Sequence, residues 1–134
     1  MIITRHIINR MEGHNMDNIS KKITKLAYDA LDEKKAEDIT VLEIGDISII
    51  ADYFIIANGT NSSQVQALVD NVEEVLAKNG HHPKRIEGVR STNWILMDYG
   101  DLVVHIFSKE DRLFYDLERI WRDGKKVSKE QLDA

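Results

Sequence analysis

The stretch that most constrains the fold of this chain is WILMDYGDLVVHIF, which runs from Trp94 to Phe107. Two mostly apolar segments flank the pair Gly100-Asp101. A two-residue loop that begins with glycine is typical of a type II′ turn, which joins two antiparallel strands tightly. The stretch therefore predicts a β-hairpin in which Tyr99 pairs with Leu102 and Trp94 pairs with Phe107.

The predicted hairpin has two faces of different character, because directly opposed residues share a face. One face is nearly all aliphatic and is expected to join the core: Ile95, Met97, Tyr99, Leu102, Val104 and Ile106. The other face mixes aromatic, aliphatic and titratable side chains: Trp94, Leu96, Asp98, Val103, His105 and Phe107. A slip of one residue would mix the two sets, so the clean sorting supports this register.

The segment before the hairpin begins with a helix and continues with strands. Apolar residues at helical spacing predict a helix that Asp17 or Asn18 caps and that ends near Lys34. A short strand is expected over Ile39–Ile44. The continuous β-rich run Tyr53–Ala57 is typical of a central strand that is buried on both faces.

A second and a third helix are expected around the hairpin. Asn61 is predicted to cap the second helix, with Gln64 in the capping-box position and Asn79-Gly80 as a left-handed end. A short strand is expected near Arg85. The third helix is predicted to begin at Ser108 and to stop before Gly124.

This order of elements predicts one α/β domain, layered in the α+β manner, with a mixed sheet of about five strands flanked by helices. A chain of 134 residues has enough interior for one core. Met1–Asn15 is expected to be a mobile extension or an over-called start, and residues 16–124 to form the domain. The charged segment 125–134 is expected to be a frayed tail.

Composition narrows the functional classes. The formal net charge of −5 disfavours direct binding to DNA or other nucleic acid through phosphates, and it suits a basic protein partner. The chain has no cysteine, so thiolate metal sites and cysteine nucleophiles are excluded and a reducing cytoplasm is the expected compartment. No apolar run approaches the length of a membrane span, so no membrane partner is expected.

Three interpretations of the mixed hairpin face remain open. In the structural one, the face packs into the fold, His105 is neutral and hydrogen-bonded, and a turn amide satisfies Asp98. In the binding one, Trp94, Leu96 and Asp98 form an aromatic anchor with an acidic neighbour, as in interface hot spots. In the enzymatic one, Asp98, Asp101 and His105 form a metal, nucleotide or catalytic cluster, although the sequence offers no further ligand.

Other candidate chemistry is weaker. The segment Gly59–Ser63 joins a strand to a helix, but it lacks the second glycine and the lysine of a phosphate-binding loop. Asn61 and Gln64 are explained as helix caps. A nucleotidyltransferase would need paired carboxylates on the next strand to hold magnesium, and only Glu87 is present there.

Several of these motifs together resemble a known family, the ribosomal silencing factor S family, also called Iojap-like. The resemblance extends over about Ile19 to Arg122. Its segments follow the family order without large gaps: ADYFIIANGTNSSQVQALVDNVEEVL, EG at Glu87-Gly88, WILMDYGDLVVHIF and RLFYDLERIW.

The resemblance implies a nucleotidyltransferase-like fold without the active site, no enzymatic activity and no cofactor. It implies binding to the large ribosomal subunit through its basic fourteenth protein, which blocks subunit joining and represses translation when nutrients are short, a form of ribosome hibernation. Family members also self-associate, so a homodimer is a further expected partner. The residues carried over to the contact surface are Trp94, Leu96, Met97, Asp98, Tyr99 and Asp101. A degenerate enzyme at Asp98, Asp101 and His105 stays the alternative.

Overall fold

The computed structural model describes residues 14–45, 51–88, 94–109 and 124–133. Three helices lie in these ranges: α2 (His14–Glu33), α3 (Ser62–Lys78) and α6 (Lys129–Asp133). The strands are β1 (Glu37–Glu43), β2 (Tyr53–Gly59), β3 (Arg85–Glu87), β4 (Trp94–Asp98), β5 (Leu102–Ser108) and β6 (Lys125–Val127).

The six strands form one mixed sheet in the order β3-β4-β5-β2-β1-β6. Strands β2 and β5 are parallel, and every other neighbouring pair is antiparallel. The α+β class with a mixed sheet and flanking helices is therefore confirmed, with one strand more than expected. The prediction of a central strand over Tyr53–Ala57 is also confirmed, because Phe54–Ala57 are buried between β5 and β1.

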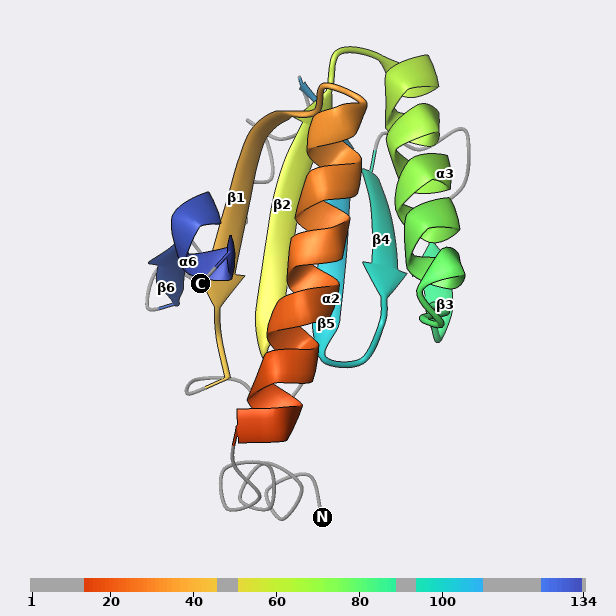
Figure 1. Cartoon of the computed structure of the whole chain (residues 1–134). Coiled ribbons are helices and arrows are strands. Elements are labelled where there is room, and N and C mark those ends of the chain that lie inside the picture. Colours follow the sequence, from red (N-terminus) through yellow and green to blue (C-terminus); the bar gives the residue numbers. More distant parts are fainter. Residues whose placement is uncertain (1–13, 46–50, 89–93, 110–123, 134) are drawn as a thin grey trace.

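Helices α2 and α3 lie side by side on one face of the sheet, as Figure 1 shows. The main core lies between these helices and the sheet, and it includes Ala27, Leu31, Leu68, Val72, Ile55, Met97 and Val104. The buried amide of Asn71 in α3 donates a hydrogen bond of 2.8 Å to the carbonyl of Ala30 in α2. The opposite face carries a second apolar cluster, which includes Phe54, Ile56, Val103 and Phe107.

The expected caps of α3 are present. The side chain of Asn61 accepts a hydrogen bond of 2.9 Å from the Gln64 amide. Gln64 reaches back to the amide of Thr60 rather than to that of Asn61, and its own amide group donates to the carbonyls of Lys34 and Lys35, just after α2. Gly80, with φ of 84°, ends the helix in the left-handed conformation that glycine adopts easily.

The predicted hairpin is confirmed in its register. Trp94 lies opposite Phe107, Leu96 opposite His105, and Asp98 opposite Val103. Gly100 has φ of 89°, and the Tyr99 amide donates to the Leu102 carbonyl at 2.9 Å, which closes the two-residue turn.

Two expectations at the chain ends need correction. Helix α2 begins at His14 and passes through Asp17 and Asn18, so these residues do not cap it. The C-terminal segment is folded rather than frayed, because β6 pairs with the edge of β1 and Leu132 of α6 is buried in the main core. Most of the expected N-terminal extension and of the expected helix after Ser108, at residues 1–13 and 110–123, lies outside the described residues.

Candidate functional site

The mixed face of the hairpin carries an aromatic stack built around the half-buried Trp94. The indole lies parallel to the ring of Phe107, its cross-strand partner, with centroids 5.4 Å apart and an interplanar angle of 8°. The indole N–H of Trp94 also donates a hydrogen bond of 3.2 Å to Nδ1 of His105. The ring is therefore held by stacking and by a directed bond, while part of its surface stays accessible.

Strand β3 adds two charged side chains to the same face. Arg85 pairs with Asp98 and Glu87 with Leu96 in the antiparallel register, so these four residues share a face. Arg85 contacts both acids, with Nε 3.4 Å from Asp98 and an Nη atom 3.0 Å from Glu87. We call the surface of Arg85, Glu87, Trp94, Leu96 and Asp98 the hairpin patch.

The two predicted acids at the turn, Asp98 and Asp101, also stabilise the fold, the first through its side chain and the second through its main-chain carbonyl. One carboxylate oxygen of Asp98 accepts a hydrogen bond of 2.8 Å from the Gly100 amide, which stabilises the turn. The carbonyl of Asp101 accepts bonds from the amides of Asp52 and Tyr53, at 2.9 and 3.1 Å, and so joins the turn to the start of β2. Asp98 remains 20% exposed, and Asp101 is half-buried.

Met97 and Tyr99, which were expected at the contact surface, lie on the other face of the hairpin. Met97 is fully buried and Tyr99 is 8% exposed, and both belong to the core beneath α2 and α3. Burial raises the pKa of the Tyr99 hydroxyl well above its usual range, with a smaller contribution from Glu73. Because side chains alternate along a strand, contiguous residues of β4 cannot all face one partner. This corrects the expectation for these two residues.

His105 fits the structural interpretation of the hairpin face. It is 5% exposed, stands next to Phe54 at 4.9 Å between ring centroids, and accepts the bond from Trp94. Burial lowers its pKa to about 4, so the ring is neutral at pH 7. A buried neutral imidazole whose Nδ1 is already occupied is poorly placed to act as a general base with Asp98 or Asp101.

Within the described ranges, no three His, Asp or Glu side chains come close enough to hold a metal ion. The enzymatic alternative at Asp98, Asp101 and His105 therefore gains no support from the geometry of these residues.

Sequence reasoning missed Arg85 and Glu87 as parts of this surface. The short strand near Arg85 was expected, but its pairing with the first hairpin strand is a contact between segments separated by residues 88–93, and no local pattern specifies it. A detectable signal is the charge alternation around Ile86, since Arg85 and Glu87 face one side and Ile86 pairs with Met97 on the other.

Fold and site together define a class: a small α+β protein with a mixed sheet, in which the β4-β5 hairpin and the edge strand β3 present an aromatic and charged surface. The chain belongs to the RsfS family, whose model is described as "Ribosomal silencing factor during starvation" and matches residues 17–134. This confirms the resemblance noted from the motifs. The chain is thus a member of a family of ribosomal silencing factors.

Relatives and solved structures agree with this assignment. The ribosomal silencing factor of Bacillus subtilis is 44% identical over 104 residues, which span 78% of this chain and 88% of that protein. A crystal structure from Bacillus halodurans matches with a TM-score of 0.70 and 39% identity, over 78% of this chain and 95% of that one. One from Chromobacterium violaceum matches with a TM-score of 0.73 and 37% identity, over 79% and 88%.

A more distant relative from Mus musculus carries the name "Mitochondrial assembly of ribosomal large subunit protein 1". It is 29% identical over 84% of this chain and 51% of that protein.

In the described parts of the chain, we find no helix with the length and apolar character that a bilayer crossing requires.

Proposed function

We propose that this chain binds the large ribosomal subunit through its fourteenth protein, uses the hairpin patch to do so, and thereby keeps the small subunit from joining. The family supports a ribosomal role. The single observation that carries the choice of surface is Trp94, a half-buried indole held by Phe107 and His105 beside charged side chains. Aromatic anchors of this kind dominate interface energetics.

The mechanism is obstruction, with no bond made or broken. A domain of this size that covers part of the subunit face would exclude another large surface from it. The net charge of −5 favours approach to a basic ribosomal protein in the cytoplasm. Occupation of the site under starvation would repress translation reversibly, as expected for a hibernation factor.

The first prediction concerns the anchor. Trp94→Ala should weaken binding to isolated large subunits by at least about 2 kcal/mol, because truncation of a central aromatic hot spot typically costs that much. Co-sedimentation with large subunits measures the affinity, and circular dichroism checks that the variant is folded.

Ile19→Ala provides a matched control. Ile19 is a large apolar side chain that is 51% exposed on α2. Helix α2 packs on the main core, and Trp94 packs against the second cluster on the other face of the sheet. This variant should bind like the wild-type chain. Undiminished binding of folded Trp94→Ala would reject Trp94 as an anchor.

Two alternatives are decided by simple measurements. An enzyme with a metal or nucleotide site at Asp98, Asp101 and His105 would melt at a higher temperature when magnesium or nucleotide is added; we expect no shift.

A homodimer that uses the hairpin patch would become monomeric in Trp94→Ala, as light scattering would show, and the ribosome would then bind elsewhere.

A further inference from the structure

At its buried position, His105 lowers the stability of the fold. It is one of few polar side chains buried in the described core, and its neighbours there include Phe54, Phe107 and Trp94. Its Nδ1 accepts from Trp94, so in the neutral ring the proton lies on Nε2. Nε2 is buried and finds no hydrogen-bond partner among the residues that the structure describes. An unpaired buried N–H destabilises a fold, so stability alone does not explain the histidine.

We propose that His105 is a positioning residue for docking: its Nδ1 accepts the indole N–H of Trp94 and holds the ring in the orientation that the ribosomal partner meets. The proposal rests on the proposed function, since Trp94 must be the anchor for its orientation to matter. His105 itself touches no partner, because it is 5% exposed.

Stacking on Phe107 alone does not fix the orientation of the Trp94 indole. Phe107 lies directly opposite Trp94 and fixes the plane of the indole, at an interplanar angle of 8°. A stacked ring can still flip by about 180° around its Cβ–Cγ bond and return to the same plane, because both faces of an indole stack equally well. The bond to His105, which lies diagonally across the strands, points the N–H edge inward and thus sets which edge of Trp94 faces solvent.

The acceptor is available under cellular conditions. Burial keeps the imidazole neutral at pH 7, since its pKa is lowered to about 4. A protonated ring would have no lone pair on Nδ1 and could not accept the bond. The indole is therefore ordered before the partner arrives, and binding does not have to supply that ordering.

Two substitutions separate positioning from a purely structural role. His105→Leu is close in volume, removes the acceptor, and also removes the unpaired Nε2–H, so the melting temperature should be kept or raised. His105→Asn has a carbonyl oxygen at the same number of bonds from Cα as Nδ1, but leaves a cavity, so the melting temperature should fall. Ile106→Val is the control for disturbance of β5, because Ile106 faces the helices.

The positioning role predicts the opposite order for binding. The dissociation constant for large subunits should rise about two- to tenfold in His105→Leu, the range for one side chain that must be ordered on binding. His105→Asn and Ile106→Val should bind close to wild type. The Trp94 indole N–H resonance, assigned by its loss in Trp94→Phe, should exchange faster with water in His105→Leu only.

A double substitution completes the test. Trp94→Phe keeps a ring but has no N–H, so adding His105→Leu to it should cost no further affinity. The proposal is overturned if folded His105→Leu binds like wild type, or if its loss of affinity persists undiminished in the Trp94→Phe background. If His105→Leu does not fold, His105→Phe removes the same acceptor and takes its place.

Failure of the proposed docking surface can be distinguished from failure of the positioning role of His105. If Trp94→Ala binds large subunits like wild type, the hairpin patch is not the docking surface. The resonance of the Trp94 N–H in the isolated protein then still decides the contact: unchanged exchange in His105→Leu would overturn the positioning role, and faster exchange would support it.

Discussion

The Asp98 carboxylate stabilises the hairpin turn and also lies beside a charged side chain of the neighbouring strand. One of its oxygens accepts the Gly100 amide within the turn, and the other lies 3.4 Å from Arg85 on the neighbouring strand. The turn amide that the structural interpretation required is thus present, and the carboxylate is still 20% exposed. Because Arg85 offsets part of its charge, Asp98 should contribute to orientation more than to affinity.

The buried histidine predicts a pH dependence of stability. An unfolded histidine has a pKa of about 6.5, and burial lowers that of His105 to about 4 in the fold. The unfolded chain therefore binds a proton more readily between these values, so the free energy of unfolding falls as pH drops through this window and levels off below it. The loss should reach about 2 kcal/mol by pH 5.

Urea denaturation at pH 7.5 and pH 5 measures this loss, and His105→Leu is the reference because it shares every other titrating group. The wild-type chain should lose more stability than the variant. An equal loss in both proteins would show that His105 is not the group responsible.

At the scale of elements, the hairpin was predictable and the C-terminal segment was not. The hairpin register follows from alternation over fourteen residues and from a glycine turn, which are local signals. Strand β6 and helix α6 are too short to fold by local preference, and they depend on the edge of β1 and on the burial of Leu132. The parallel pairing of β2 with β5 is equally non-local, since α3, β3 and β4 lie between them in the chain.

For the candidate site, alternation alone sorts Trp94, Leu96 and Asp98 from Met97 and Tyr99. The contiguous set that the family resemblance implies mixes the two faces, whereas the structure places Met97 and Tyr99 in the main core and packs Trp94 and Leu96 against the second cluster.

Leu132 tests the tertiary origin of the C-terminal fold. Leu132→Ala should lower the free energy of unfolding by about 2–3 kcal/mol, because it leaves a cavity under α6. Amide exchange in β6 and α6 should accelerate, and affinity for large subunits should stay unchanged because β6 lies at the opposite edge of the sheet from β3 and β4. If denaturation showed the same free energy of unfolding for Leu132→Ala as for the wild-type chain, this result would contradict the burial of the side chain.

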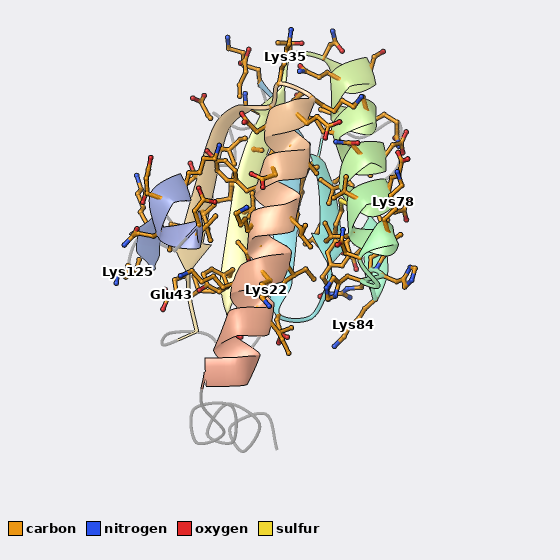
Figure 2. The ribbon with its side chains drawn as sticks, viewed as in Figure 1. Lys22, Lys35, Glu43, Lys78, Lys84 and Lys125 are labelled. Atoms are coloured by element: carbon orange, nitrogen blue, oxygen red, sulfur yellow. The ribbon has the colours of Figure 1, made fainter. Side chains whose placement is uncertain are left out.

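For the whole molecule, the sheet places the hairpin patch and the C-terminal elements at opposite edges. The hairpin patch lies at the β3-β4 edge, and the C-terminal elements close the other edge beside β1 (Figure 1). Figure 2 shows the same separation for two charged residues: Lys84 lies by the hairpin turn, and Glu43 lies on β1, near the opposite edge. Under the proposed function, the net charge of −5 would attract a basic partner from a distance, and the acids of the hairpin patch would orient the docking.

This arrangement predicts that the association rate with large subunits falls as salt increases from low values to about 0.15 M. Asp98→Asn should reduce that dependence, because the amide keeps an oxygen for the Gly100 N–H and loses the charge. Glu43→Gln removes an equal charge from the far edge and should have a smaller effect. A rate that is flat with salt would count against steering by these acids.

The most direct test of the central claim is a subunit-joining measurement. Isolated large subunits are incubated with the chain, small subunits are added, and light scattering follows the formation of joined ribosomes. The wild-type chain at stoichiometric amounts should suppress joining, and Ile19→Ala should do the same, while folded Trp94→Ala should leave joining close to the level without protein. Normal joining in the presence of bound wild-type chain would contradict obstruction, and full suppression by Trp94→Ala would contradict the hairpin patch as its origin.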